Sequence, residues 1–234
     1  MEKIFNTLSE SLFRKIQAKE NLIISFSGEN SQFIRFNNAT IRQTGLVDDA
    51  EIMLKFIANN RTVQGGFTVS GNFDIDYARG KSEIERMRIE TKEIPEDPFI
   101  VLPENLASSH EIIPSNGMPF EDAVDAILPA MQGVDFVGIW ANGNLYRGSA
   151  NNLGQKHWFE TENYSLDYSL VTSKHQMVKG SFAGSEWDQK SYEDYVKRSR
   201  NKLSLMERDP VKIKPGNYRT WFESAAVSDF ISMF

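Results

Sequence analysis

The sequence contains no cysteine and only three histidines, at positions 110, 157 and 175. Without cysteine, its 234 residues cannot form a disulfide bond, hold a metal through thiolates or use a cysteine nucleophile. A chain free of cysteine suits the cytoplasm, where disulfides are rare. Metal binding through nitrogen would have to use these few histidines, so the sequence offers little material for a transition-metal site.

Long apolar runs and an excess of basic residues are also missing. No apolar stretch approaches the roughly 20 residues that a membrane-spanning helix needs, and the N-terminus lacks the apolar segment of a secretion signal. The net charge of -6 and the isoelectric point near 5.2 create no overall field that attracts nucleic acid. The longest basic cluster, residues 197–202, has acidic neighbours in a helical pattern and is interpreted as a solvated helix face. We therefore expect a cytoplasmic protein that contacts neither a membrane nor nucleic acid directly.

The spacing of apolar residues predicts an α+β protein with two lobes of mainly antiparallel, curved β-sheet covered by helices. The first lobe is expected over residues 1–92. Within it, residues 4–16 carry apolar side chains every four positions, which indicates an amphipathic helix. From residue 21 onward apolar and polar side chains alternate, as in strands, and Asn59-Asn60 suits a tight turn between two of them. A second helix is expected over 74–90.

Five prolines between residues 93 and 119 predict an irregular connection between the lobes. The central lobe, 120–210, is expected to begin with a helix over 120–132. Strand-like segments rich in aromatic and β-branched residues follow and indicate a second sheet, and a helix from about Trp187 to Met206 closes the lobe. Residues 211–234 predict a turn, a brief strand and the beginning of a helix, as the start of a C-terminal domain that is absent from this chain.

The stretch GNLYRGSA, residues 143–150, is close to the phosphate-binding pattern G-x-x-x-x-G-K-[ST]. Ser149 and Ala150 stand where the lysine and the magnesium-binding hydroxyl should be, and the following asparagines and glycine do not favour the required helix. Nucleotide binding is therefore not expected. Asn142-Gly143 between two strand-like segments predicts a β-hairpin turn instead.

Motifs for hydrolytic chemistry are incomplete. His110-Glu111 resembles the start of a zinc-binding H-E-x-x-H helix, but Pro114 replaces the second histidine and would break that helix. His157 and Glu160 are three residues apart in a strand-like segment, so their side chains should point to opposite faces. No G-x-S-x-G nucleophile motif occurs. The sequence thus identifies neither catalytic nor metal-binding residues.

The segment GIWANGNLYRGSANNLGQKHWFE, residues 138–160, resembles the central segment of the TldD/PmbA family, whose members include proteins called modulators of DNA gyrase. Two later segments, 181–188 and 215–227, are also similar to that family. The central match consists of Gly138, Gly143, Arg147, Gly148, Ala150, Asn151 and Gly154.

The resemblance implies curved sheets, a cytoplasmic location and a role in peptide proteolysis or maturation. It also implies a pair of related chains, in which a TldD-type subunit binds zinc through His-Glu-x-x-x-His and a PmbA-type (TldE) subunit does not. The first two positions of that motif fall close to Ser232-Met233, which can neither ligate zinc nor act as its general base. We therefore expect no cofactor in this chain, and zinc only in a TldD-type partner.

Three functions remain open from the sequence. The first is a non-catalytic PmbA/TldE-like subunit or fragment that binds a peptide or unfolded polypeptide together with a TldD-type zinc subunit, or that self-associates. The second is an interaction module that recruits another chain at exposed sheet edges. The third is a hydrolase with an unrecognised site near Arg147 and His157. Candidate residues for binding a peptide or a partner are Tyr146, Arg147, Asn151 and His157.

Overall fold

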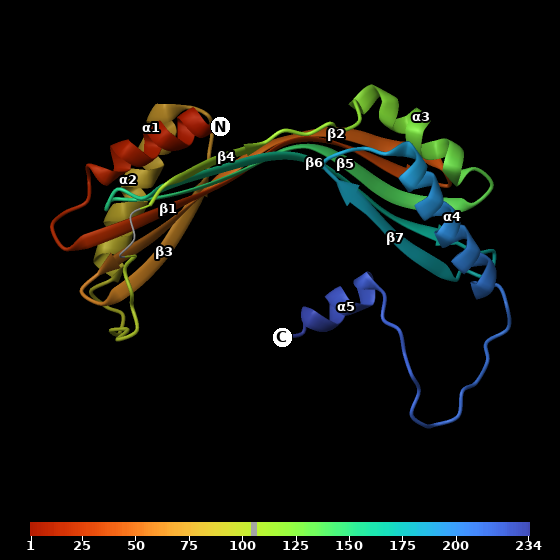
Figure 1. The fold of residues 1–234 in the computed structure, drawn as a ribbon. Helices are drawn as coiled ribbons and strands as arrows, with labels where there is room; N and C mark the ends of the chain where they lie inside the picture. The colour runs from red at the N-terminus through yellow and green to blue at the C-terminus, as the bar shows by residue number, and fades with distance from the viewer. Residues whose placement is uncertain (104–106) are drawn as a thin grey trace.

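A computed structural model describes residues 1–103 and 107–234; the remaining three residues belong to the proline-rich connection and lie outside the described residues. The described strands form one seven-stranded sheet in the order β3-β2-β1-β5-β6-β4, with β7 also paired to β6. The sheet is arched, as Figure 1 shows. The strands are β1 (Glu20–Asn37), β2 (Thr40–Ala58), β3 (Arg61–Thr68), β4 (Ser109–Ile113), β5 (Asp135–Asn151), β6 (Lys156–Val171) and β7 (Met177–Gly184). The helices are α1 (Glu2–Phe13), α2 (Phe73–Glu90), α3 (Ala123–Ile127), α4 (Gln189–Met206) and α5 (Ser224–Ile231), with 3-10 turns η1 (Phe120–Asp122) and η2 (Leu128–Met131).

The α+β class is confirmed, but the expectation of a second sheet is wrong. Strand β5 pairs antiparallel with β1 along most of its length, from Ile23 opposite Asn151 to Phe36 opposite Gly138. The strands of the central lobe therefore continue the sheet of the first lobe. The pairing is antiparallel throughout except between β4 and β6, which run parallel. The long strands β1, β2, β5 and β6 run from one end of the arch to the other (Figure 1).

Two separate hydrophobic cores occupy the two ends of the sheet on its outer, convex face. Helices α1 and α2 cover one end, and α3 and α4 cover the other (Figure 1). Because side chains alternate between the faces of a strand, the even-numbered residues of β1, β5 and β6 point toward these helices. Phe26 of β1 belongs to the first core and Phe36 of the same strand to the second. The two lobes predicted from the sequence thus correspond to two hydrophobic cores that share one sheet.

Glycines allow close packing in the first core. A Cβ atom on Gly80, inside α2, would lie 2.8 Å from the side chain of Leu12 on α1. A Cβ atom on Gly148 in β5 would lie 2.9 Å from the ring of Phe5, which stacks on Trp158 with a centroid distance of 5.9 Å. Removing a buried phenylalanine side chain of this kind costs about 3–5 kcal/mol. The two glycines therefore let α1 lie close to both α2 and the sheet.

The turn at Asn59-Asn60 is confirmed, since both residues have positive φ, 50° and 54°. The turn expected at Asn142-Gly143 is wrong, because β5 runs through both positions without interruption. Gly143 instead permits a close approach of β1, since a Cβ atom there would lie 2.3 Å from the carbonyl oxygen of Asn30. The chain reverses after Asn151, where Gly154 has φ 108°.

Two predicted elements differ near the C-terminal half. The helix expected over 120–132 is divided into η1, α3 and η2. Pro129 ends α3, because it lacks an amide hydrogen and its ring clashes with the preceding helical turn. The brief strand expected in the last segment does not occur among the described residues, whereas the helix does, as α5.

Helix α4 begins at Gln189, where the Asp188 side chain accepts a hydrogen bond of 2.6 Å from the Ser191 amide. None of the described helices has both the length and the apolar character needed to cross a bilayer.

Candidate functional site

The concave face of the sheet carries the odd-numbered side chains of β1, β5 and β6, opposite to the helices. Arg147 lies on this face toward the end that α1 and α2 cover from the other side, between Ser27 of β1 and Phe159 of β6. His157 lies one row further along, opposite Ser149. The structure therefore brings two of the four candidate residues, Arg147 and His157, to one surface.

Tyr146 lies on the other face of the sheet. Its ring packs against Trp158 in the first core, with the centroids 6.1 Å apart and the planes 29° apart. Burial raises the pKa of the Tyr146 hydroxyl, and the nearby carboxylates of Glu160 and Asp48 add to the shift. Tyr146 and Arg147 are consecutive in a strand and cannot act on one ligand at one face.

Asn151 has a structural role at the reversal between β5 and β6. Its Oδ1 atom accepts hydrogen bonds from the backbone amides of Leu153, at 3.1 Å, and Gln155, at 3.0 Å. The Asn151 side chain is buried, and its amide donates to Oε1 of Gln155 at 3.1 Å. The side-chain amide thus shapes the turn, and these hydrogen bonds occupy it.

Arg147 and His157 have different local partners. Nη1 of Arg147 donates to the backbone oxygen of Tyr146 at 2.8 Å and to that of Gly28 at 3.5 Å, and its side chain is exposed. Nδ1 of His157 lies 2.8 Å from Oγ of Ser109, on the neighbouring strand β4. The Arg147 guanidinium retains donors that face solvent and can bind a carboxylate.

The Ser109–His157 contact has the distance required between a nucleophilic hydroxyl and its base. A working hydrolase of this type also needs a group that orients the imidazole and donors that stabilise an oxyanion. Within the described residues, no carboxylate hydrogen bonds to the second nitrogen of His157. Sequence analysis missed Ser109 because 48 residues separate it from His157 and only the β4–β6 pairing joins them.

The remaining histidines make no cluster. His110 contacts the Glu2 carboxylate at 3.3 Å, and His175 has φ 59° in the turn before β7. Over residues 1–103 and 107–234, no three His, Asp or Glu side chains are grouped as metal ligands would be.

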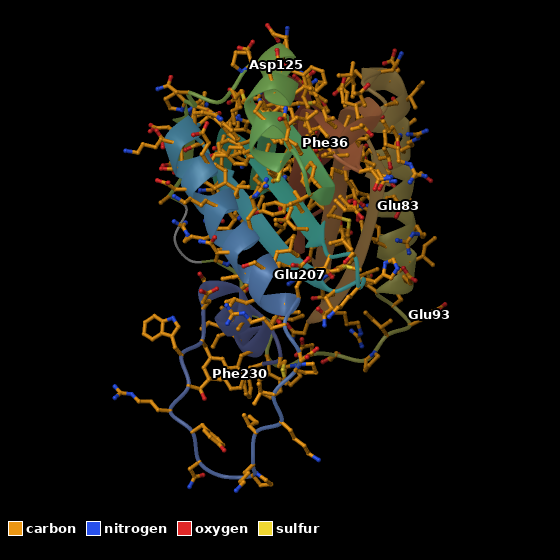
Figure 2. The ribbon with its side chains drawn as sticks, turned by 90° about the vertical axis from the view of Figure 1, so that its right-hand side faces the viewer. Phe36, Glu83, Glu93, Asp125, Glu207 and Phe230 are labelled. Atoms are coloured by element: carbon orange, nitrogen blue, oxygen red, sulfur yellow. The ribbon has the colours of Figure 1, made fainter. Side chains whose placement is uncertain are left out.

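A cleft of about 1460 Å³ opens at the other end of the concave face. Its walls are the ends of β1, β2, β5, β6 and β7, the side of α4, and residues 221–229 of the C-terminal segment. This segment leaves α4 as an open loop and returns beneath the sheet as α5, where Phe230 lies below Glu207 in Figure 2. Every side chain from Ser204 to Phe234 is exposed, so this wall of the cleft is only lightly packed.

Cations outnumber acids around the cleft. The cationic side chains in its walls are Arg35, Arg42, Lys179, Arg198 and Lys202. The acidic ones are Asp167, Glu223 and Asp229. Sequence analysis missed these cations, because they come from four elements, β1, β2, β7 and α4, and because residues 197–202 were interpreted as an ordinary solvated face.

Comparison with solved structures supports the fold, whereas comparison with family models and curated sequences finds no relative of this chain. No model of a known protein family matches the chain, and no curated protein matches it. Solved structures do match, and their match over 86–87% of this chain supports a TldD/PmbA-type fold. That fold is therefore the class to which the structure belongs.

One of the similar structures is TldE from Thermococcus kodakarensis, with 15% identity and a TM-score of 0.61; the match covers 86% of this chain and 47% of TldE. Two others are described as modulators of DNA gyrase. The one from Thermotoga maritima has 11% identity and a TM-score of 0.57, over 86% of this chain and 48% of that one. The one from Bacteroides thetaiotaomicron has 10% identity and a TM-score of 0.60, over 87% of this chain and 49% of that one. The chain spans about half the length of these proteins.

Proposed function

We propose that this chain is a non-catalytic, TldE-like subunit that binds a peptide or unfolded polypeptide together with a zinc-bearing partner of the TldD type, in cytoplasmic proteolysis or peptide maturation. The observation that carries the proposal is the shared fold with TldE over 86% of the chain. The concave face agrees with it, because this face is long, largely polar and not covered by the α1–α4 helices. Such a surface can hold an extended polypeptide.

The zinc is assigned to the partner because the residues of this chain do not fit the metal. The resemblance places the expected His-Glu pair close to Ser232 and Met233, which directly follow α5. A hydroxyl and a thioether are poor ligands for zinc, and neither can serve as the general base. The exposed apolar side chains of α5, among them Phe230 and Ile231, suit contact with another polypeptide surface.

The proposal is tested by reconstitution. The purified chain is mixed with a TldD-type zinc subunit, the size of the product is measured by light scattering, and cleavage of an unfolded polypeptide is followed by mass spectrometry. We expect a complex, with cleavage only when both chains are present and with zinc lost to a chelator only from the partner. Cleavage by this chain alone that stops on adding a chelator would show that the proposal is wrong.

A second candidate is an interaction module that acts through a free sheet edge. Strand β3 pairs with β2 only from Glu51 to Ala58, so within the described residues the outer side of β2 from Thr40 to Asp49 has no paired strand. Unpaired amides and carbonyls of this kind can accept an added strand. Leu46 on this edge is 79% exposed, which favours contact with a partner.

The two candidates differ in what an edge substitution does. Leu46→Pro removes one amide donor from the edge, whereas Leu46→Lys keeps the donor and adds a charge. If strand addition is the function, the amount of partner that the chain binds should fall strongly in Leu46→Pro and less in Leu46→Lys. If capture and peptide cleavage in the reconstituted mixture are both unchanged by Leu46→Pro, the edge is not used.

A further inference from the structure

We propose that the cleft at the β7 end of the concave face selects acidic polypeptide segments, specifically extended segments with two carboxylates about four residues apart. The inference rests on the proposed function, because it names the class of polypeptide that the concave face would bind. It begins from the charge of the cleft: five cationic side chains and three acidic ones, in a chain whose net charge is -6.

Several of these cations are not neutralised within the chain. Lys202 forms an ion pair with Glu223, which fixes both groups. In the described residues no carboxylate lies within ion-pair distance of Arg35, Arg42 or Lys179. Arg35 contacts the ring of Phe33, with its guanidinium carbon 5.7 Å from the ring centroid, and keeps its hydrogen-bond donors available.

The sheet register sets the spacing of the two cations at the floor of the cleft. Arg35 lies opposite Ile139 of β5, which lies opposite Asp167 of β6. Lys179 of β7 lies opposite Ser169, in the next row of the same face. From Arg35 on β1 to Lys179 on β7 there are three strand-to-strand spacings across the sheet and a shift of two residues along the strand. The two backbones are therefore about 16 Å apart.

A polypeptide in an extended conformation advances about 3.3 Å per residue and turns alternate side chains to one side. Carboxylates at positions i and i+4 therefore share a side and lie about 13 Å apart, within reach of the long Arg35 and Lys179 side chains. Asp167 lies between the two cations and disfavours a third carboxylate in the middle of the segment. The cleft should thus prefer acidic residues separated by neutral ones over a continuous acidic run.

Aromatic side chains provide an apolar part of the same surface. Trp221 and Phe222 line the cleft and are 89% and 61% exposed. Arg198 contacts the ring of Tyr195, with its guanidinium carbon 5.4 Å from the centroid, so a cation and an aromatic ring meet at the α4 wall. A ligand with neutral apolar residues beside its carboxylates would cover these rings.

The test uses fluorescent ten-residue peptides and the full chain, with binding followed by fluorescence anisotropy at low salt. The peptides carry the cores ESGSE, EEESS, QSGSQ and KSGSK in identical flanks. We expect ESGSE to bind most tightly and QSGSQ and KSGSK to bind at least about tenfold more weakly, because two charge pairs are lost. Binding of ESGSE should weaken as salt is raised.

Substitutions locate the site. Arg35→Gln combined with Lys179→Gln should weaken binding of ESGSE roughly tenfold. The matched control, Lys81→Gln with Arg14→Gln, removes two cations at the other end of the molecule and should leave binding unchanged. Lys179→Glu should lower the affinity for ESGSE and raise that for KSGSK, which a merely misfolded variant would not do.

Four results would overturn the inference: equal binding of QSGSQ and ESGSE, tighter binding of EEESS than of ESGSE, an equal loss in the control variant, or tighter binding of a single-stranded oligonucleotide than of any peptide. The binding assay uses no zinc partner and no cleavage. If the peptides show no charge preference, the proposal of partner-dependent proteolysis still stands. If no complex or cleavage is found on reconstitution, a measured charge preference still stands.

Discussion

Arg88 at the end of α2 holds the Glu20 carboxylate at the start of β1 through two hydrogen bonds, from Nε at 2.6 Å and from Nη2 at 2.8 Å. The same guanidinium donates to the carbonyl oxygen of Lys15 at 3.0 Å. Its central carbon lies 5.8 Å from the ring centroid of Phe56 on β2. One side chain thus connects α2 to the turn after α1 and to the sheet.

Glu20→Gln should lower the free energy of unfolding by about 1–3 kcal/mol, because Arg88 would lose a charged partner at a site where both side chains are mostly buried. Glu85→Gln is the matched control: Glu85 also pairs with Arg88 but is 56% exposed, so the loss should stay within about 1 kcal/mol. Urea unfolding of the three proteins measures the difference. Equal losses in the two variants would contradict the role given to Glu20.

The same pair predicts a pH dependence at the acid end. Burial alone would raise the pKa of Glu20, but hydrogen bonds from Arg88 and from the backbone of Gln17, with the Arg88 charge, hold that pKa below its ordinary value of 4.5. The folded state therefore keeps the carboxylate ionised where the unfolded state takes up a proton. Its contribution is present above pH 4.5 and is lost as the pH falls through the lowered pKa. In Glu20→Gln, this part of the acid dependence of the unfolding free energy should disappear.

Gly143→Ala should destabilise the protein by about 1–3 kcal/mol, because the new Cβ would lie 2.3 Å from the Asn30 carbonyl oxygen and 2.4 Å from Cα of Ser31. Both neighbours are backbone atoms of β1, so the strands themselves must shift. Gly216→Ala is the control, since the nearest atom there would be 3.6 Å away. Thermal unfolding followed by circular dichroism compares them. An unchanged midpoint for Gly143→Ala would mean that the two strands are not so closely packed.

The burial of Tyr168 leads us to expect that the free energy of unfolding falls at alkaline pH. Burial raises its pKa to about 12, although the contact with Ser199, at 2.8 Å between the hydroxyl oxygens, opposes the shift. The unfolded state therefore releases the proton first. The contribution of Tyr168 is fully present below pH 10 and is lost as the pH rises through about 12. Tyr168→Phe should remove this part of the dependence and cost about 1 kcal/mol at neutral pH, since the buried Ser199 hydroxyl loses its partner. The free energy of unfolding in urea, measured between pH 7 and 12, provides the check.

His157→Ala and Arg147→Ala test the remaining hydrolase hypothesis. If the chain is a non-catalytic subunit, His157→Ala should leave the turnover number of the reconstituted complex unchanged. Arg147→Ala should at most weaken peptide binding, because its guanidinium lies on the concave face. Steady-state kinetics separates the two effects. A loss of turnover by two orders of magnitude or more in His157→Ala, and an equal loss in Ser109→Ala, would instead support a Ser–His hydrolase.

Several elements could be predicted from the sequence because their causes are local. The period of four in residues 4–16 predicts the helix that becomes α1, and Asn59-Asn60 predicts a turn that both residues adopt. The Asn142-Gly143 prediction failed for an equally clear reason. A pair that favours a turn has only a small local preference, and pairing on both sides of β5 with β1 and β6 outweighs it.

Local sequence patterns predict the α+β class, the amphipathic first helix and the alternation of the strands, and the segment 138–160 carries the resemblance to the TldD/PmbA family. The folded chain alone shows that the strands form one sheet, that Tyr146 and Arg147 lie on opposite faces, and that cations from four elements meet at one cleft. The physical reason is sequence separation. Periodicity depends on neighbours a few residues apart, whereas the cleft joins residues as distant as Arg35 and Lys202, which strand register and a shared arched sheet bring together.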